Sequence, residues 1–101
     1  MNASTLSHTA LLSFQRALSG AVPPQLRQAS IEVDSIACLV RVKFEYDGDP
    51  DPEALAACQI AGTEVIADFA APWRIYEQHN AVASPGLLAP LQCIAYRRES
   101  V

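Results

Sequence analysis

The sequence predicts an α+β fold, a two-layer sandwich in which two helices cover one face of a four-stranded, mainly antiparallel sheet. Residues 40–46 alternate apolar and polar side chains, as in a strand that is buried on one face. Residues 54–69 repeat apolar side chains at helical spacing. The acidic, proline-containing segment 47–53 separates these two patterns and indicates a turn. The element order along the whole chain is α-β-β-α-β-β.

Length and composition indicate a single domain, residues 1–101. Half of the residues are hydrophobic and 18% are charged, so the chain can bury a core and does not have the composition of a disordered protein. A formal net charge of −4 argues against nucleic acid and membrane as partners and permits a basic protein partner. Three cysteines without metal-ligand spacing suit reduced thiols, and no signal peptide or membrane span is evident. We therefore expect a cytoplasmic protein with no metal and no cofactor.

The first half of the chain predicts a helix and a hairpin. Apolar residues at helical spacing in residues 11–18 predict the first helix, with Ser7 or Thr9 as its cap. Residues 1–8 are small and polar, so we expect them to be flexible. Residues 29–34 alternate like a strand, and the short link to the next strand predicts an antiparallel hairpin.

The second half predicts one more helix and two more strands. Asp49 or Asp51 is the expected N-cap of the second helix, and a proline follows each of them. Gly62 in the middle of this helix indicates close packing on the sheet, because glycine there lowers helix stability. Residues 73–79 and 91–97 are the third and fourth strands, which we expect to form a second antiparallel hairpin.

Acidic residues occupy every second position from Glu45 to Glu53. They do not form an EF-hand, because Pro52 stands where the loop needs glycine and Cys58 stands where it needs glutamate. Helix capping and a solvated turn explain the later acids. Glu45 and Asp47 are not explained in this way, and a partner-facing acidic rim is a second interpretation.

Several other residues leave two interpretations open. Glu64 and Asp68 repel each other on one helix face, which indicates either a partner contact or neutralisation by a basic residue of another element. Trp73 is a core anchor or an interface anchor, and its place at a strand start favours the core. His79 near Glu77 has no nucleophile at a suitable spacing, so we predict a surface histidine and a non-enzymatic protein.

Four parts of the chain resemble immunity proteins of bacterial polymorphic toxin systems, in particular those of contact-dependent growth inhibition. They are residues 26–27 with 31–34, residues 42–48, residues 60–69 and residues 95–99. The most specific parts are the Tyr46-Asp47-Gly48 turn and the Glu64-Val65-Ile66-Ala67-Asp68-Phe69 segment. Residues 77–91 depart from the family pattern.

The resemblance implies a non-enzymatic protein that binds one cognate toxin domain, often a nuclease, and covers its active site or substrate-binding site. An acidic inhibitor suits a basic toxin, because complementary charge accelerates the encounter of the two proteins. The candidate partner contacts are Tyr46, Asp47, Asp49, Asp51, Glu64, Asp68 and Trp73. The alternative function is a small structural or assembly domain that forms a weak homodimer through an open sheet edge or face.

Overall fold

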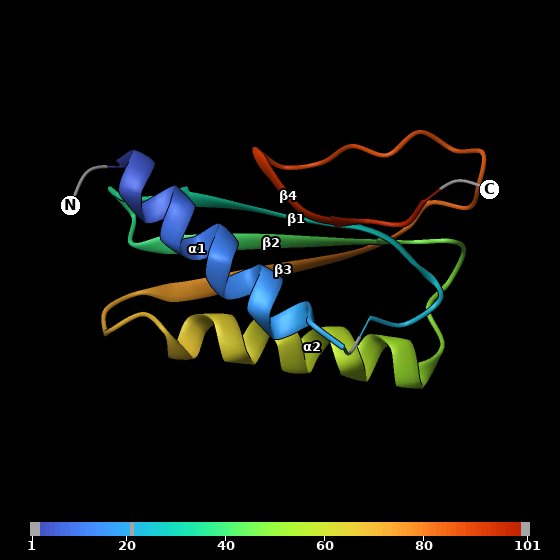
Figure 1. Cartoon of the computed structure of the whole chain (residues 1–101), viewed down its shortest axis with the longest axis horizontal. Helices are drawn as coiled ribbons and strands as arrows, with labels where there is room; N and C mark the ends of the chain where they lie inside the picture. Colours follow the sequence, from blue (N-terminus) through green and yellow to red (C-terminus); the bar gives the residue numbers. More distant parts are fainter. Residues whose placement is uncertain (1–2, 21, 100–101) are drawn as a thin grey trace.

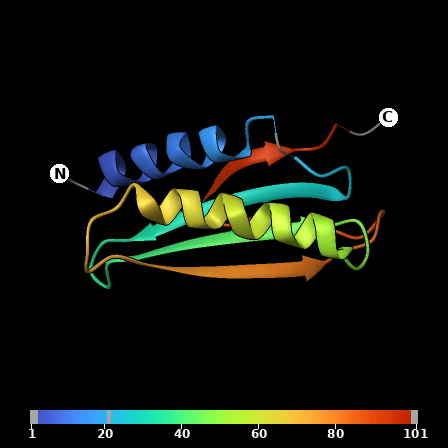
Figure 2. The same cartoon turned by 90° about the horizontal axis from the view of Figure 1, so that it is seen from below.

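The computed structural model of the protein describes residues 3–20 and 22–99. Its elements follow the predicted order (Figure 1): α1 (Ala3–Leu18), β1 (Leu26–Asp34), β2 (Leu39–Tyr46), α2 (Pro52–Ala67), β3 (Arg74–Ala81) and β4 (Cys93–Arg97). Both helices lie on the same side of the sheet (Figure 2). The predicted α+β class, with two helices packed on a four-stranded sheet, is therefore confirmed.

Helix α1 begins at Ala3, earlier than the predicted caps Ser7 and Thr9. Leu6 is half-buried and lies one turn before the buried Ala10, so the apolar stripe of the helix extends toward its N-terminus. The segment 1–8, which we expected to be flexible, overlaps this helix, and its residues 1–2 lie outside the described residues.

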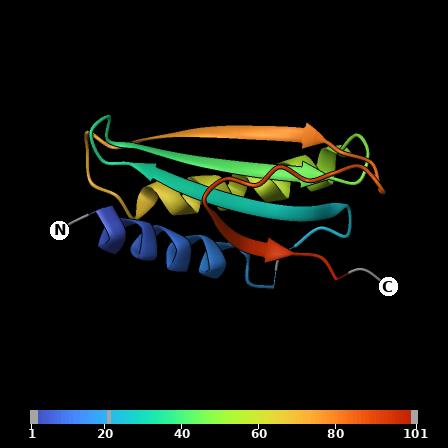
Figure 3. The same cartoon turned by 90° about the horizontal axis from the view of Figure 1, so that it is seen from above.

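The sheet has the strand order β3-β2-β1-β4. β1 and β2 form the predicted antiparallel hairpin, and β4 pairs antiparallel with β1. β3 pairs parallel with β2, so the predicted second hairpin is wrong, and β3 and β4 lie at opposite edges. Helix α2 connects β2 to β3 as a crossover, the kind of connection that parallel neighbours require. Residues 82–92 then cross the sheet to reach β4 (Figure 3).

The core is built on one face of β2. The predicted alternation is confirmed, because the inward-facing residues of this strand are fully buried: Val40, Val42, Phe44 and Tyr46. Helix α1 contributes Phe14, whose ring meets the Phe44 ring edge-on, with 5.5 Å between the centroids and 85° between the planes. Such an aromatic pair stabilises the fold by about 1 kcal/mol beyond the burial of its surface.

Helix α2 is fixed by its N-cap and by a close contact at its middle. The Asp51 side chain accepts a hydrogen bond from the Ala54 N–H at 2.8 Å, and Pro52 is the first helical residue, as predicted. Gly62 is buried, and a Cβ atom at this position would overlap with the carboxylate of Glu77 on β3. The prediction that Gly62 marks close packing of the helix on the sheet is therefore confirmed.

We expect Gly62→Ala to lower the free energy of unfolding by about 1 kcal/mol, because the added methyl group must displace the Glu77 carboxylate. That carboxylate is held by a 2.9 Å hydrogen bond to Nε2 of His79. Urea unfolding measures the change. In a Glu77→Ala background the obstacle is removed, and Gly62→Ala should instead raise the free energy of unfolding by about 1 kcal/mol through helix propensity. Equal effects in the two backgrounds would contradict the proposed contact.

Candidate interaction surface

His79 lies on the core-facing side of β3. Its ring stacks on the Phe44 ring at 4.9 Å between centroids. Nδ1 lies 2.8 Å from the Tyr46 hydroxyl oxygen, and Nε2 lies 2.9 Å from Oε1 of Glu77. Only 17% of the side chain is exposed, so the prediction of a surface histidine is wrong. His79 instead joins the edge strand β3 to the core strand β2.

The hydrogen bonds that link Glu77, His79 and Tyr46 continue into the interior, where the Tyr46 hydroxyl contacts the Cys58 thiol. Tyr46 is fully buried, and burial raises the pKa of its hydroxyl far above the ordinary value. Burial also raises the pKa of the Cys58 thiol, so the thiol stays protonated at neutral pH and does not supply a thiolate nucleophile. A fully buried tyrosine presents no surface to a partner. Tyr46 is therefore removed from the candidate contacts.

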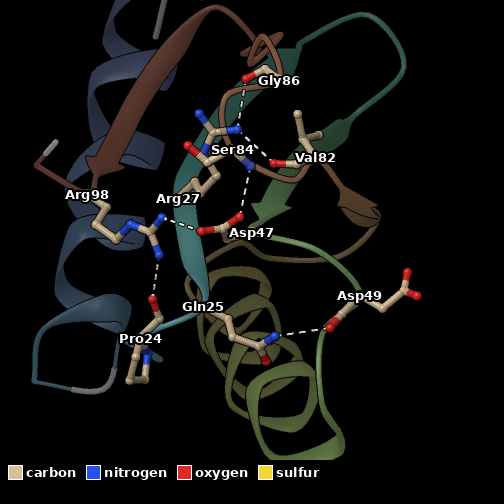
Figure 4. A network of polar contacts seen from close by, with 9 residues as sticks. All are labelled: Pro24, Gln25, Arg27, Asp47, Asp49, Val82, Ser84, Gly86 and Arg98. Carbon is tan, nitrogen blue, oxygen red and sulfur yellow. Dashed lines mark hydrogen bonds and ion pairs between the residues drawn. The ribbon is translucent and has the colours of Figure 1, made fainter.

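Residues 82–91, which we call the strap, cross the sheet on the face opposite the helices (Figure 3). Arg27 donates from Nη1 to two carbonyl oxygens of the strap, those of Val82 at 2.7 Å and Gly86 at 2.9 Å (Figure 4). Glu45, which is 1% exposed, accepts a hydrogen bond from a strap N–H at 2.7 Å. Because buried backbone groups need partners, these side chains hold the strap in place. The role of Glu45 is therefore structural.

Asp47 fastens the strap to the C-terminal segment. Its Oδ1 accepts a hydrogen bond from the Ser84 N–H at 2.9 Å, and its Oδ2 lies 2.8 Å from Nη2 of Arg98 (Figure 4). The hydrogen bonds from Arg98 and from the Ser84 N–H lower the pKa of Asp47 below its ordinary value of 3.8. Both of its carboxylate oxygens therefore have partners within the fold, and Asp47 is removed from the candidate contacts.

Asp68 and Trp73 also have partners within the fold. Ser13 of α1 donates to Oδ2 of Asp68 at 2.6 Å, and Arg16 lies 3.9 Å from the same oxygen. Of the two interpretations of Asp68, neutralisation by another element is thus the one that the contacts support. Trp73 is half-buried and packs against Phe69 with 5.2 Å between ring centroids, in agreement with the favoured core role.

Besides Asp68, which is exposed but has partners on α1, three of the candidate contacts are exposed: Asp49, Asp51 and Glu64. Glu53 is exposed in the first turn of α2, and we call Asp49, Asp51, Glu53 and Glu64 the acidic α2 surface. Among the described residues, no basic side chain forms an ion pair with any of the four. Gln25 orders the turn before α2, because it donates to the Asp49 carbonyl oxygen at 3.0 Å (Figure 4) and accepts from the Asp51 N–H at 2.9 Å.

The positive charges lie on other elements than α2, and one of them, Arg16 of α1, lines a depression together with Glu64 and Asp68. The sequence contains no lysine or arginine between residues 44 and 73. The basic residues lie on α1 or on and beside the strands: Arg16, Arg27, Arg41, Lys43, Arg74, Arg97 and Arg98. The segment without basic residues is visible in the sequence. It identifies Glu53 as a further candidate contact, which the sequence analysis did not include.

Within residues 3–20 and 22–99, no group of three or more His, Cys, Asp or Glu side chains is placed to hold a metal ion. In the same part of the chain, no helix combines the length and the hydropathy that a membrane-spanning segment needs. Cys38, Cys58 and Cys93 are all free thiols. The acidic α2 surface is thus the best-defined candidate site on the described chain.

We expect Asp47→Asn to lower the free energy of unfolding at neutral pH and to lose much of this effect in acid. A carboxyl group whose pKa is lowered by folding contributes stability above its unfolded pKa, and this contribution is lost as the pH falls through the folded pKa. The window therefore lies below the ordinary value of 3.8. Urea midpoints at about pH 7 and about pH 2 measure the change. Asp49→Asn, at an exposed carboxylate without an ion-pair partner, is the control, and an Asp47→Asn effect that persists in acid would contradict the assignment.

Residues 7–100 match the family described as MafI2 immunity protein. No curated protein is significantly similar to the chain in sequence. An immunity protein neutralises a cognate toxin and is typically non-enzymatic, so the match confirms the predicted toxin-neutralising role and the predicted lack of catalysis. The contact-dependent delivery system stays a prediction. Because the match covers almost the whole sequence, the chain belongs to the MafI2 immunity protein family.

Proposed function

We propose that the protein neutralises its cognate toxin domain in the cytoplasm by binding it through the acidic α2 surface and covering the toxin's active site or substrate-binding site. The observation that carries this proposal is a set of four exposed carboxylates in a segment without lysine or arginine: Asp49, Asp51, Glu53 and Glu64. Like charges gathered on one surface repel one another and reduce stability slightly. A partner that brings positive charge to this surface relieves the repulsion and gains binding free energy.

The chemistry of this surface favours a toxin domain with a basic groove, such as a nuclease. A nuclease uses basic side chains to bind phosphates, and carboxylates placed against those side chains occupy them and exclude the nucleic acid. Helix α2 has 16 residues and is therefore about 24 Å long. Asp49, Asp51 and Glu53 lie at its N-terminal end and Glu64 lies near its C-terminal end, so a groove that binds all of them must be extended.

The turn before α2 is also ordered before a partner arrives. Asp51 caps the helix, and Gln25 bonds to the backbone of Asp49 and Asp51. Fewer backbone conformations are then lost when the toxin binds, so more of the interaction free energy appears as affinity.

The triple variant Asp49→Asn, Asp51→Asn, Glu64→Gln should weaken binding of the cognate toxin domain by more than about tenfold at low salt. Asparagine retains the N-cap at residue 51, so the helix should remain intact. Isothermal titration calorimetry at several salt concentrations measures the effect. The affinity of the natural protein should fall as salt rises, and that of the variant should change less.

A matched control removes the same charge elsewhere through Glu32→Gln, Asp34→Asn and Glu99→Gln. These acids lie on β1 and after β4. The control should bind like the natural protein and protect cells that co-express the toxin domain. Equal losses in the two triple variants would show that net charge governs binding, and an unchanged affinity in the first would rule out the acidic α2 surface.

A second candidate function, self-association, is favoured by the open edge of β3. This strand has 8 residues and, among the described strands, pairs with β2 alone, so its other edge presents backbone groups that a second copy can bind. Light scattering over a wide concentration range should then show a dimer at high concentration. A strict monomer throughout would rule this function out.

A further inference from the structure

We infer that Ile60 is the apolar anchor of the acidic α2 surface, and that it enters an apolar recess bordered by basic residues on the cognate toxin domain. This inference rests on the proposed function and goes beyond it, because it names the centre of the interface and the chemistry of the partner's complementary surface. No charge on Ile60 can steer the encounter, so its contribution would come from burial after docking.

Ile60 is 60% exposed on the outer face of α2. Helix stability does not explain its presence there, because isoleucine is a poorer helix former than alanine and its branched side chain loses rotamer freedom in a helix. The exposed Ala56 and Ala67 on this helix are explained by helix propensity alone. Ile60 is therefore the residue of this face whose cost is not offset within the monomer.

The surroundings of Ile60 resemble the centre of an interface. A shallow depression on α2 is lined by Ala56, Gln59, Ile60, Thr63 and Glu64. The small side chains in this set leave room for a partner to approach the isoleucine closely. Thr63 donates its hydroxyl to the Gln59 carbonyl oxygen at 3.1 Å, so this polar group is satisfied within the helix. A partner group can cover it without leaving a donor unpaired.

Acids lie on the same helix stripe at both sides of Ile60. Glu53 precedes it by seven residues and Glu64 follows it by four, which are spacings that place side chains on one face. With a rise of 1.5 Å per residue, the two carboxylates lie about 10 Å and about 6 Å along the axis from Ile60. An apolar contact surrounded by charged residues that exclude water is the arrangement of an interface hot spot.

Other exposed large hydrophobic residues do not share this setting. They are Leu12, Ile36, Tyr76, Leu87 and Ile94. Each lies outside the segment 44–73 that lacks basic residues, so charge complementarity with a basic partner selects Ile60 among them. The complementary toxin surface therefore carries lysine or arginine side chains on two sides of an apolar recess.

The test compares Ile60→Ala with Leu87→Ala, using the purified cognate toxin domain. Leu87 is 93% exposed on the strap and serves as the matched control for loss of an exposed aliphatic side chain. Ile60→Ala should raise the dissociation constant at least about tenfold through faster dissociation, with little change in salt dependence. Leu87→Ala should leave it unchanged. Alanine raises helix propensity, so the first variant should remain folded, and circular dichroism checks this.

A second variant, Ile60→Arg, places a cation among the acids and should abolish measurable binding and protection of cells that co-express the toxin. If the natural protein does not bind the domain, the proposed function itself is wrong. If the natural protein binds and Ile60→Ala binds equally well, the anchor is overturned while the proposed function stands. A loss in Leu87→Ala alone would place the interface on the strap and also overturn the inference.

Discussion

The packing of two other rings against Phe44 is the interaction on which the remaining structure depends. Phe14 of α1 meets the Phe44 ring edge-on, and His79 of β3 stacks on it. A single buried ring thus brings a helix and an edge strand to the central strand β2. The Tyr46 hydroxyl, one inward position further along β2, completes the contact by bonding to His79. Removing the Phe44 ring would leave a cavity that α1 and β3 both border, and it would weaken the attachment of each to β2.

The acidic residues divide into two groups with different physical roles. Glu45, Asp47 and Asp68 each accept hydrogen bonds from groups distant in sequence, and their charge is used to hold the strap and to join α1 to α2. Asp49 and Glu64 accept no such bond from a described side chain, and their charge stays available at the surface. Stability and recognition are therefore served by different carboxylates, although all of them lie within one stretch of the sequence.

Local patterns in the sequence were enough to predict β2 and the start of α2. The alternation of residues 40–46 and the cap at Asp51 depend on neighbours a few positions away, so the sequence alone reveals them. The strap could not be predicted, because the ion pair between Asp47 and Arg98 joins residues 51 positions apart. The mixed pattern of β3 has a similar cause, because inward positions that normally carry apolar side chains hold Glu77 and His79. These two side chains bond to each other, and His79 also bonds to Tyr46 of β2.

The rigid attachment of α2 has a consequence for how such a protein distinguishes one toxin from another. The helix is fixed by its Asp51 cap at one end, by the Asp68 contact with Ser13 at the other, and by Gly62 against β3 between them. None of these contacts involves the part of the outward face around Ile60, which is formed by Ala56, Gln59, Ile60, Thr63 and Glu64. Substitutions on that face can therefore change charge and shape without disturbing the core. Because the helix backbone is fixed, it cannot adjust to a toxin whose charges do not match. Binding such a toxin would leave carboxylates of the helix buried without a partner, and this cost in binding free energy favours the cognate toxin over related ones.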